Sequence, residues 1–442
     1  MLKNTLLPVE EFAQRRQAFM SAMPESSIAI VKSAEEITRS NDTDFPFCQD
    51  KNFYYLTGFH EPDALLVMIK GEENISILFC QEKDPLMEVW HGRRVGPETA
   101  SKQFGFDSSF DNSLRKDKVL NYLAQVDSVH CCFSDSELMV EITAWIADVA
   151  AQTRIGKKAP VSLQDCSETI NELRLHKSAR EIELMRRANI ISGQAHQRAM
   201  IETRAGKFEY QIEAELLHEF AVNGARHAAY GSIVAGGDNA NILHYNDNDE
   251  SLSDGDLLLI DAGGELAGYA ADITRTFPVN GIFSAPQKAI YQLVLDAQNA
   301  AIEAIKPGNS FSTLNDLVCD ILTKGLYDLG ILTGELPTLI QDKACKKYFI
   351  HGLGHWLGLD VHDVGDYHAN DKRQQLRPFA PGMIMTIEPG IYIPLGSDVD
   401  KKWQGIGVRI EDNVLVTDSG HENLTINAPK SIEAIEALMK QV

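Results

Sequence analysis

Residues 256–279 read DLLLIDAGGELAGYAADITRTFPV, and the spacing of Asp261 and Asp272 from the glycines around them recurs later in the chain. The later copy is divided between GMIMTIEPGIYIP at 382–394 and GVRIEDNVLV at 407–416. In each copy the first acid follows one glycine by six residues and precedes another by two, while the second acid follows its own glycine by four. The acids are Asp261, Asp272, Glu388 and Glu411. Three spacing matches in the same order predict a duplicated unit whose two halves face a shared centre.

The duplication extends to the segments in front of the acids. Two glycines are each followed by apolar residues at offsets of six, ten and fourteen, which trace one face of a helix. The first set is Gly206, Ile212, Leu216 and Phe220, and the second is Gly308, Leu314, Val318 and Leu322. We therefore predict one unit at about 180–280 and its repeat at about 285–415.

The composition is that of a folded protein with two domains. The chain has 442 residues, of which 44% are hydrophobic and 24% charged, so it is long enough for more than one core. Its formal charge of −22 argues against nucleic acid as a partner, because binding phosphates requires concentrated lysine and arginine.

The first third of the chain alternates strand-like and helical segments, which is typical of a mixed α/β domain. Apolar runs predict strands at 27–31, 64–69 and 75–79, and apolar residues at helical spacing predict a helix over 136–150. A long helix is expected to begin after Ser178, because Glu181 three residues on completes a capping box. We place an amino-terminal α/β domain at 1–175 and a second domain at 176–442.

The cysteines and the opening segment indicate a reducing compartment. Seven cysteines occur without a CxxC spacing, which predicts reduced core thiols. The first residues lack the apolar run of a signal peptide, and no stretch reaches the roughly 18 apolar residues of a membrane span. We expect a cytoplasmic protein without a membrane partner.

Residues 256–279 read as a strand, a glycine-rich turn and a second strand, with Asp261 closing the first strand and Asp272 lying in its partner. All four acids follow or interrupt apolar runs, so we expect them to be at least partly buried. A buried carboxylate is costly unless a cation compensates it. One interpretation is that each acid pairs with a nearby arginine, such as Arg275 or Arg409, or lies at a solvated strand end. The matched offsets favour another interpretation, in which four carboxylates balance two divalent cations. Oxygen ligands with a single imidazole select ions such as manganese or cobalt.

Histidines that could complete such a site lie in HGLGHWLGLDVHD, at 351–363. Histidines four apart can mark a helical zinc site, but the glycines in this segment disfavour a long regular helix. One histidine as ligand, with the others as proton handlers or oxyanion donors, fits better. A matching histidine, His244, precedes the first acidic copy in NILHYND.

At these residues the chain resembles the metallopeptidases of the pita-bread fold, and among them the Xaa-Pro aminopeptidases, or aminopeptidase P. Residues 351–363 match the proline-peptidase signature, and RSNDTDFPFCQDKNFYYLTGFHEPDALLV at 39–67 resembles the amino-terminal domain of bacterial aminopeptidase P. That domain argues against methionine aminopeptidase. The resemblance implies an α/β (α+β) fold, in which a smaller amino-terminal α/β domain precedes a pita-bread catalytic domain with pseudo-twofold duplication.

The resemblance also implies a five-ligand site for two divalent metal ions per subunit, with manganese expected and cobalt or zinc as alternatives. Asp272 and Glu411 would bridge the two ions, and Asp261 would chelate one of them. His355 and Glu388 would complete the other. A hydroxide shared by the ions would attack the carbonyl of the bond that precedes proline.

Five further residues receive supporting roles from the same resemblance. His244 and His362 would contact the substrate carbonyl and support the tetrahedral intermediate. His351 and Arg409 would line the proline side, and Tyr230 would lie beside the metals. The implied substrates are peptides with proline at the second position.

The resemblance leaves three questions open. Prolidase, which accepts only dipeptides, shares the metal cluster, and a non-catalytic peptide-binding protein could share the fold. Creatinase lacks the metal ligands, and the complete set here counts against it. We expect a homo-oligomer, either a dimer or a tetramer. Asp42 and Trp90 could reach an active site, and in similar enzymes such contacts come from a neighbouring subunit. The alternative interpretation for both residues is plain surface or interdomain packing.

Overall fold

The computed structural model describes residues 6–369 and 375–440. The chain divides into two compact units, Met1–Arg174 and Leu175–Val442. The seven cysteines are free thiols; six are buried as predicted, but the prediction of a core position is wrong for Cys48, which is exposed. Within the described residues, no helix is both long and apolar enough to cross a bilayer.

The first unit is built on a six-stranded mixed sheet of order β6-β5-β4-β1-β7-β8. The predicted strands are confirmed as β1, β4 and β5, and the predicted helix as α6, which buries its apolar face. The strands of this unit are β1 (Ser27–Lys32), β2 (Thr38–Ser40), β3 (Thr43–Asp44), β4 (Leu65–Lys70), β5 (Ile75–Cys80), β6 (Ser108–Asp111), β7 (Ser128–Cys131) and β8 (Ser162–Asp165). The helices are α1 (Val9–Ala22), α2 (Lys51–Thr57), α3 (Pro85–His91), α4 (Pro97–Phe104), α5 (Arg115–Leu123), α6 (Ser136–Ala150) and α7 (Ser167–Leu175).

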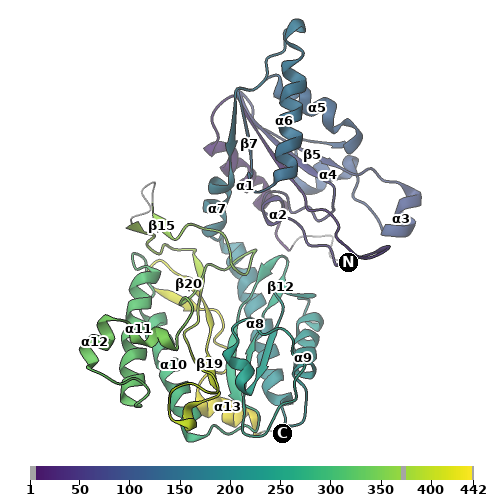
Figure 1. Ribbon diagram of the computed structural model, residues 1–442. Coiled ribbons are helices and arrows are strands. Elements are labelled where there is room, and N and C mark those ends of the chain that lie inside the picture. Colours follow the sequence, from purple (N-terminus) through teal and green to yellow (C-terminus); the bar gives the residue numbers. More distant parts are fainter. Residues whose placement is uncertain (1–5, 370–374, 441–442) are drawn as a thin grey trace. The chain divides into compact units, whose positions relative to one another are not determined.

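The second unit repeats one arrangement of two helices followed by antiparallel strands. The helix pair α8–α9 flanks the strands on one side and the pair α10–α11 on the other (Figure 1). The helices are α8 (Ala179–Glu202), α9 (Glu209–Val222), α10 (Ala285–Glu303), α11 (Phe311–Asp328), α12 (Leu336–Gln341) and α13 (Ile432–Met439).

Small antiparallel sheets fill the space between the helix pairs. Three of them are three-stranded, with orders β10-β11-β14, β13-β12-β9 and β17-β20-β21. The strand pairs beside the acids, β11–β14 and β17–β20, correspond in the repeat. Strands of the first half are β9 (His227–Ala228), β10 (Ile233–Gly236), β11 (Leu257–Asp261), β12 (Gly264–Leu266), β13 (Tyr269–Ala270) and β14 (Thr274–Pro278). Strands of the second half are β15 (His368–Ala369), β16 (Gln375–Leu376), β17 (Ile384–Ile387), β18 (Gly390–Ile393), β19 (Ile406–Arg409), β20 (Asp412–Val416) and β21 (His421–Asn423).

Backbone conformations confirm most of the predicted repeat. The apolar residues at matched offsets are buried in α9 and α11, and the glycines before these helices have φ values of +87° and +93°. The glycines six residues before the first acids, Gly255 and Gly382, have φ values of +87° and +86°. Both turns therefore use the left-handed region that glycine tolerates. The capping box of Ser178 and Glu181 at the start of α8 is also present.

Two details of the sequence prediction are wrong. Asp272 does not lie inside the strand that partners β11 but two residues before β14, because the hairpin β12–β13 leaves this ladder and pairs with β9 instead. The glycines four residues before the second acids, Gly268 and Gly407, are also not structurally equivalent. Gly268 has a φ of +87°, whereas Gly407 is required for a close approach, since a Cβ there would lie 2.6 Å from Ala240 O.

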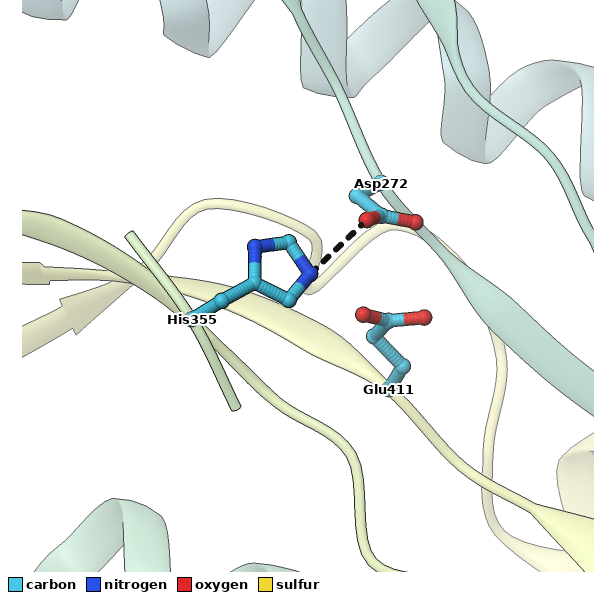
Figure 2. A group of neighbouring side chains, drawn as sticks. All are labelled: Asp272, His355 and Glu411. Atoms are coloured by element: carbon cyan, nitrogen blue, oxygen red, sulfur yellow. Dashed lines mark ion pairs between the residues drawn. The ribbon is translucent and has the colours of Figure 1, made fainter. Parts of the chain in front are cut away.

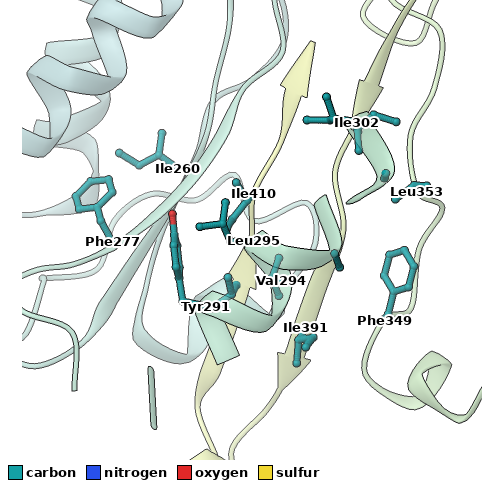
Figure 3. Close-up of a cluster of buried hydrophobic side chains, with 14 of the residues drawn as sticks. Ile260, Phe277, Tyr291, Val294, Leu295, Ile302, Phe349, Leu353, Ile391 and Ile410 are labelled. Carbon is teal, nitrogen blue, oxygen red and sulfur yellow. The ribbon is translucent and has the colours of Figure 1, made fainter. Parts of the chain in front are cut away.

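One hydrophobic core joins the two halves of the second unit (Figure 3). Tyr291, Val294 and Leu295 of α10 belong to the same buried cluster as Ile260 of β11 and Ile410, which follows β19. Burial of a large apolar side chain contributes roughly 1.5–3 kcal/mol, so this continuous core fixes the halves against each other. The strand ends that carry the acids are positioned by the same packing.

Candidate metal centre

Apolar strands bring the four acids to one place. Asp261 is the last residue of β11, whose other residues are fully or almost fully buried, and Glu388 directly follows β17. Glu411 directly precedes β20, and its N–H donates to Thr274 O at 3.0 Å, across the two halves. Gly263 allows its own backbone to pack directly against the backbone beside Asp272, because a Cβ on Gly263 would collide with Ala271 O.

Three of the predicted ligands form the core of the cluster. Asp272, His355 and Glu411 each offer a ligand atom, and these atoms all lie within 4.8 Å of one another. Their side chains point toward a common space (Figure 2). His355 Nε2 lies 3.4 Å from Asp272 Oδ2 and 3.7 Å from Glu388 Oε1. The cluster thus draws on both halves of the repeat.

Asp261 lies beside the cluster, held by an arginine and a tyrosine. Arg409 Nη2 is 2.7 Å from Asp261 Oδ2, so the arginine-pairing interpretation is right for this one acid. The Tyr230 hydroxyl lies 2.6 Å from Asp261 Oδ1 and 2.5 Å from Asp272 Oδ1. Arg275 pairs instead with Asp412, at 2.7 Å. The guanidinium of Arg409 and the Tyr230 hydroxyl together fix the orientation of the Asp261 carboxylate.

The pKa values of the glutamates reflect crowding of buried acids. Burial, followed by the neighbouring carboxylates, raises the pKa of Glu411 well above its usual value. Burial also raises the pKa of Glu388 to about 7, although His355 and Arg409 oppose the shift. Because an ionised carboxylate in such a site is costly without a counter-charge, the donor set fits bound cations.

His355 and His351 are shifted in opposite directions. Burial opposes a charge on His355, but the contacts with Asp272 and Glu388 raise its pKa to about 9. Burial and the nearby Arg409 lower the pKa of His351 to about 3. The His351 ring is therefore neutral near pH 7, with one nitrogen that donates a hydrogen bond and one that accepts.

All ten site residues predicted from the sequence line one cavity of about 500 Å³. They are Tyr230, His244, Asp261, Asp272, His351, His355, His362, Glu388, Arg409 and Glu411. The remaining walls are partly apolar, with Ile233, Leu243 and Val361 among the lining residues. The other two positions named from the sequence, Asp42 and Trp90, lie in the first unit and are exposed, Trp90 by 77%.

Sequence reasoning missed two residues that organise the site. The Tyr392 hydroxyl accepts from Arg409 Nη1 at 2.9 Å and lies 2.8 Å from His351 Nε2. The Thr274 hydroxyl donates to Glu411 Oε2 at 2.7 Å. Thr274 stands two residues after Asp272, and Tyr392 four after Glu388. Even offsets place side chains on one face of an extended segment, so this periodicity could have found both.

The fold and the site define a class of protein: a mixed α/β chain with a duplicated second unit and a buried carboxylate–imidazole cluster of the kind that holds hard or borderline divalent metals. The chain belongs to metallopeptidase family M24, whose model matches residues 183–418. The model of the aminopeptidase P N-terminal domain matches residues 12–130. These matches confirm the predicted pita-bread fold and the domain that precedes it.

Relatives and solved structures match over nearly the whole length. The chain is 47% identical over 437 residues to the Xaa-Pro aminopeptidase of Haemophilus influenzae, covering 98% of each chain. It is 42% identical to that of Escherichia coli K12, covering 97% of each. E. coli aminopeptidase P with the inhibitor Pro-Leu superposes with a TM-score of 0.95 at 42% identity, covering 98% of this chain and 99% of that one. Proline aminopeptidase P II from Yersinia pestis gives 0.96 at 43% identity, covering 99% and 100%.

Proposed function

We propose that this chain is an Xaa-Pro aminopeptidase, which hydrolyses the bond between the first residue of a peptide and a proline at the second position. The observation that carries this proposal is the single cavity lined by a metal-type cluster and by three further histidines. Relatives of this name match at 47% and 42% identity over almost the full chain. E. coli aminopeptidase P has been solved with Pro-Leu, a dipeptide that begins with proline.

Five residues would hold two divalent ions: Asp261, Asp272, His355, Glu388 and Glu411. Four carboxylates carry the charge that two such ions neutralise. The raised pKa values of Glu388 and Glu411 support the need for cations, because they reflect negative charge that is costly in this buried site. When bound, the ions would supply a nucleophile from water near neutral pH and would polarise the scissile carbonyl. Manganese suits these ligands, and zinc is an alternative because a zinc-substituted E. coli aminopeptidase P has been solved with product.

The remaining residues of the cavity would bind and orient the substrate. His244 and His362 would face the substrate carbonyl, and burial, aided by the nearby His355, keeps the pKa of His362 below its usual value. A neutral imidazole can donate one hydrogen bond to an oxygen on which negative charge develops. His351 and Arg409, joined through the Tyr392 hydroxyl, would line the pocket for the proline ring.

The chemistry of proline explains why such an enzyme is needed. The peptide bond to proline is a tertiary amide without an N–H, and the ring fixes φ. Peptidases that bind an extended substrate through that N–H lose the contact. A rigid cluster beside a pocket for the ring does not require this donor, so the bond can be cleaved.

Two alternatives make different predictions for peptide length and turnover. The proposed enzyme, loaded with manganese, should release the first residue from both Xaa-Pro and Xaa-Pro-Yaa-Zaa peptides. Cleavage confined to the dipeptide would make the protein a prolidase. Binding without any release would make it a peptide-binding protein of the same fold, against which the complete ligand set argues. Metal analysis of the same preparation would give the identity and number of ions.

We also propose that the protein is a cytoplasmic homo-oligomer, in which residues 1–175 form the amino-terminal domain and 176–442 the catalytic domain. The exposed Trp90 is a candidate contact to a neighbouring subunit. Light scattering of wild-type protein and of Trp90→Ala tests this point. A monomeric wild-type protein would contradict the oligomer.

A further inference from the structure

Glu209 is not among the residues that line the cavity, yet its side chain holds the loop that carries one of them. Glu209 is the first residue of α9 and its side chain is fully buried. The start of a helix favours a negative charge, because the first N–H groups point outward there. The Glu209 N–H also donates to Glu250 O at 3.0 Å, so backbone and side chain both face the same loop.

Four hydrogen bonds converge on this one carboxylate, and their donors lie on both sides of position 244 in the chain. Oε1 accepts from Gly236 N at 2.7 Å and from Asn239 Nδ2 at 3.2 Å, and Oε2 accepts from Tyr245 Oη at 2.7 Å and from Glu250 N at 3.1 Å. Loop 236–250, which makes up most of the connection between β10 and β11, is therefore tied at both of its ends and directly beside His244. A buried carboxylate with this many donors is well satisfied without an ion pair.

A second residue of the same helix holds the far part of the loop. Glu213, one turn after Glu209, accepts from Asn248 Nδ2 at 3.1 Å. Asn248 is 2% exposed, and it also accepts from Val234 N at 3.0 Å and donates to Ser232 O at 2.9 Å. Helix α9 thus determines the path of the whole loop, although only Glu209 binds the residue next to His244.

His244 depends on this loop for its position. Its side chain is exposed and lines the cavity, whereas the neighbouring Tyr245 is buried and bonded to Glu209. An exposed ring is placed mainly by its backbone, since few packed neighbours constrain its rotamer. By contrast, the rings of His351 and His355 are held by hydrogen bonds.

We propose that Glu209 is a positioning residue, which fixes loop 236–250 so that His244 faces the carbonyl of the substrate. This inference rests on the proposed function and deepens it. Glu209 itself would touch neither substrate nor metal. Its effect on catalysis would pass through His244 alone.

The substitution Glu209→Gln tests the proposal with little change in volume. The new NH₂ group must face an N–H donor at either position: Gly236 N and Asn239 Nδ2 on one side, or Glu250 N on the other. At least one hydrogen bond is therefore lost, and the loop shifts. We expect kcat on an Xaa-Pro-Yaa peptide to fall about 10- to 100-fold, because a displacement of about 1 Å in an active site can cost about 100-fold. Bound manganese should remain at the wild-type level.

A double-mutant cycle with His244→Ala separates positioning from general damage. If Glu209 acts through His244, then Glu209→Gln lowers kcat in the wild-type background but has no further effect in the His244→Ala background. Equal losses in both backgrounds, or loss of manganese from Glu209→Gln, would overturn the proposal. The control Glu215→Gln makes the same chemical change on α9, at a partly exposed pair with Arg198, and should keep wild-type kinetics.

Three further outcomes are distinguishable. If Glu209→Gln does not fold, Tyr245→Phe removes a single hydroxyl and must give the same dependence on His244, or the proposal fails. If the wild-type protein releases no residue from Xaa-Pro peptides, the proposed function itself fails, and the role of Glu209 fails with it. If His244→Ala retains full activity, only the positioning role is refuted.

Discussion

The ion pair between Lys177 and Asp363 allows a quantitative test of how the histidine loop is held. Lys177 Nζ lies 3.0 Å from Asp363 Oδ2, and each side chain is 1% exposed. Asp363 directly follows His362, and its N–H donates to Trp356 O at 2.9 Å. The pair therefore fastens the loop that carries the site histidines to the segment before α8. We consider Lys177→Met, which keeps the length of the side chain and removes its charge.

The expected cost follows from the geometry. At an effective dielectric constant of about 20, unit charges at the observed distance attract by about 5.5 kcal/mol. In Lys177→Met, part of this lost attraction is offset, because the variant has no lysine ammonium group that must be removed from water on folding. Removing one partner of a buried pair costs about 3–5 kcal/mol, since the other charge stays buried. For the second unit, Leu175–Val442, that corresponds to a decrease in Tm of about 5–9 °C.

Urea unfolding followed by circular dichroism measures this cost. Lys177→Met and Asp363→Asn should each lose about 3–5 kcal/mol, and the double variant should lose clearly less than the sum. Lys288→Met is a matched control, because Lys288 pairs with Glu436 at 44% exposure and should cost at most about 1 kcal/mol. A Lys177→Met protein within about 1 kcal/mol of wild type, or strictly additive losses, would refute the reasoning.

Three further predictions concern the cluster, pH and the backbone. Asp272→Ala or Glu411→Ala should abolish turnover and metal retention together, measured by peptide assay and elemental analysis; full activity in either would contradict the ligand assignment. Burial lowers the pKa of His196 from 6.5 to about 4. As the pH falls through this range, the His196 ring therefore stays neutral in the folded protein but gains a proton in the unfolded chain. The free energy of unfolding should therefore fall by up to about 3 kcal/mol between pH 6.5 and 4, and a urea titration of His196→Gln should lack that part of the slope. Gly263→Ala should reduce folded protein and metal binding, because its Cβ collides with the facing backbone, whereas Gly420→Ala, with open space, should stay within about 0.5 kcal/mol of wild type in the same unfolding assay.

The sequence predicted the repeat and the converging acids because repeated backbone conformations leave repeated residue types. Gly255 and Gly382 recur since both turns need a positive φ, and the apolar runs after them form strands that end at the acids. The same reasoning misplaced Asp272, because the pairing of β12 with β9 depends on residues far away in the chain. Local spacing carries no information on such a contact.

Residues that organise the site from a distance were beyond sequence reasoning. Glu209 is one of 63 acidic residues, and nothing in its neighbourhood in the sequence distinguishes it. Its importance comes from a loop that begins 27 residues later, at Gly236. The pairing of Lys177 with Asp363 spans 186 residues. Long-range polar contacts of this kind follow from the tertiary fold and leave no periodic pattern.

The division of the ligands between two similar halves has an evolutionary consequence. Asp272 comes from the first half, and His355 and Glu411 from the second, so an ancestor with a single copy would have assembled such a cluster between the two subunits of a symmetric dimer. Fusion of two such copies into one chain would release each copy from the constraint of identity. One copy now supplies aspartates and the other glutamates, and selection has been able to tune the two faces of the active site separately.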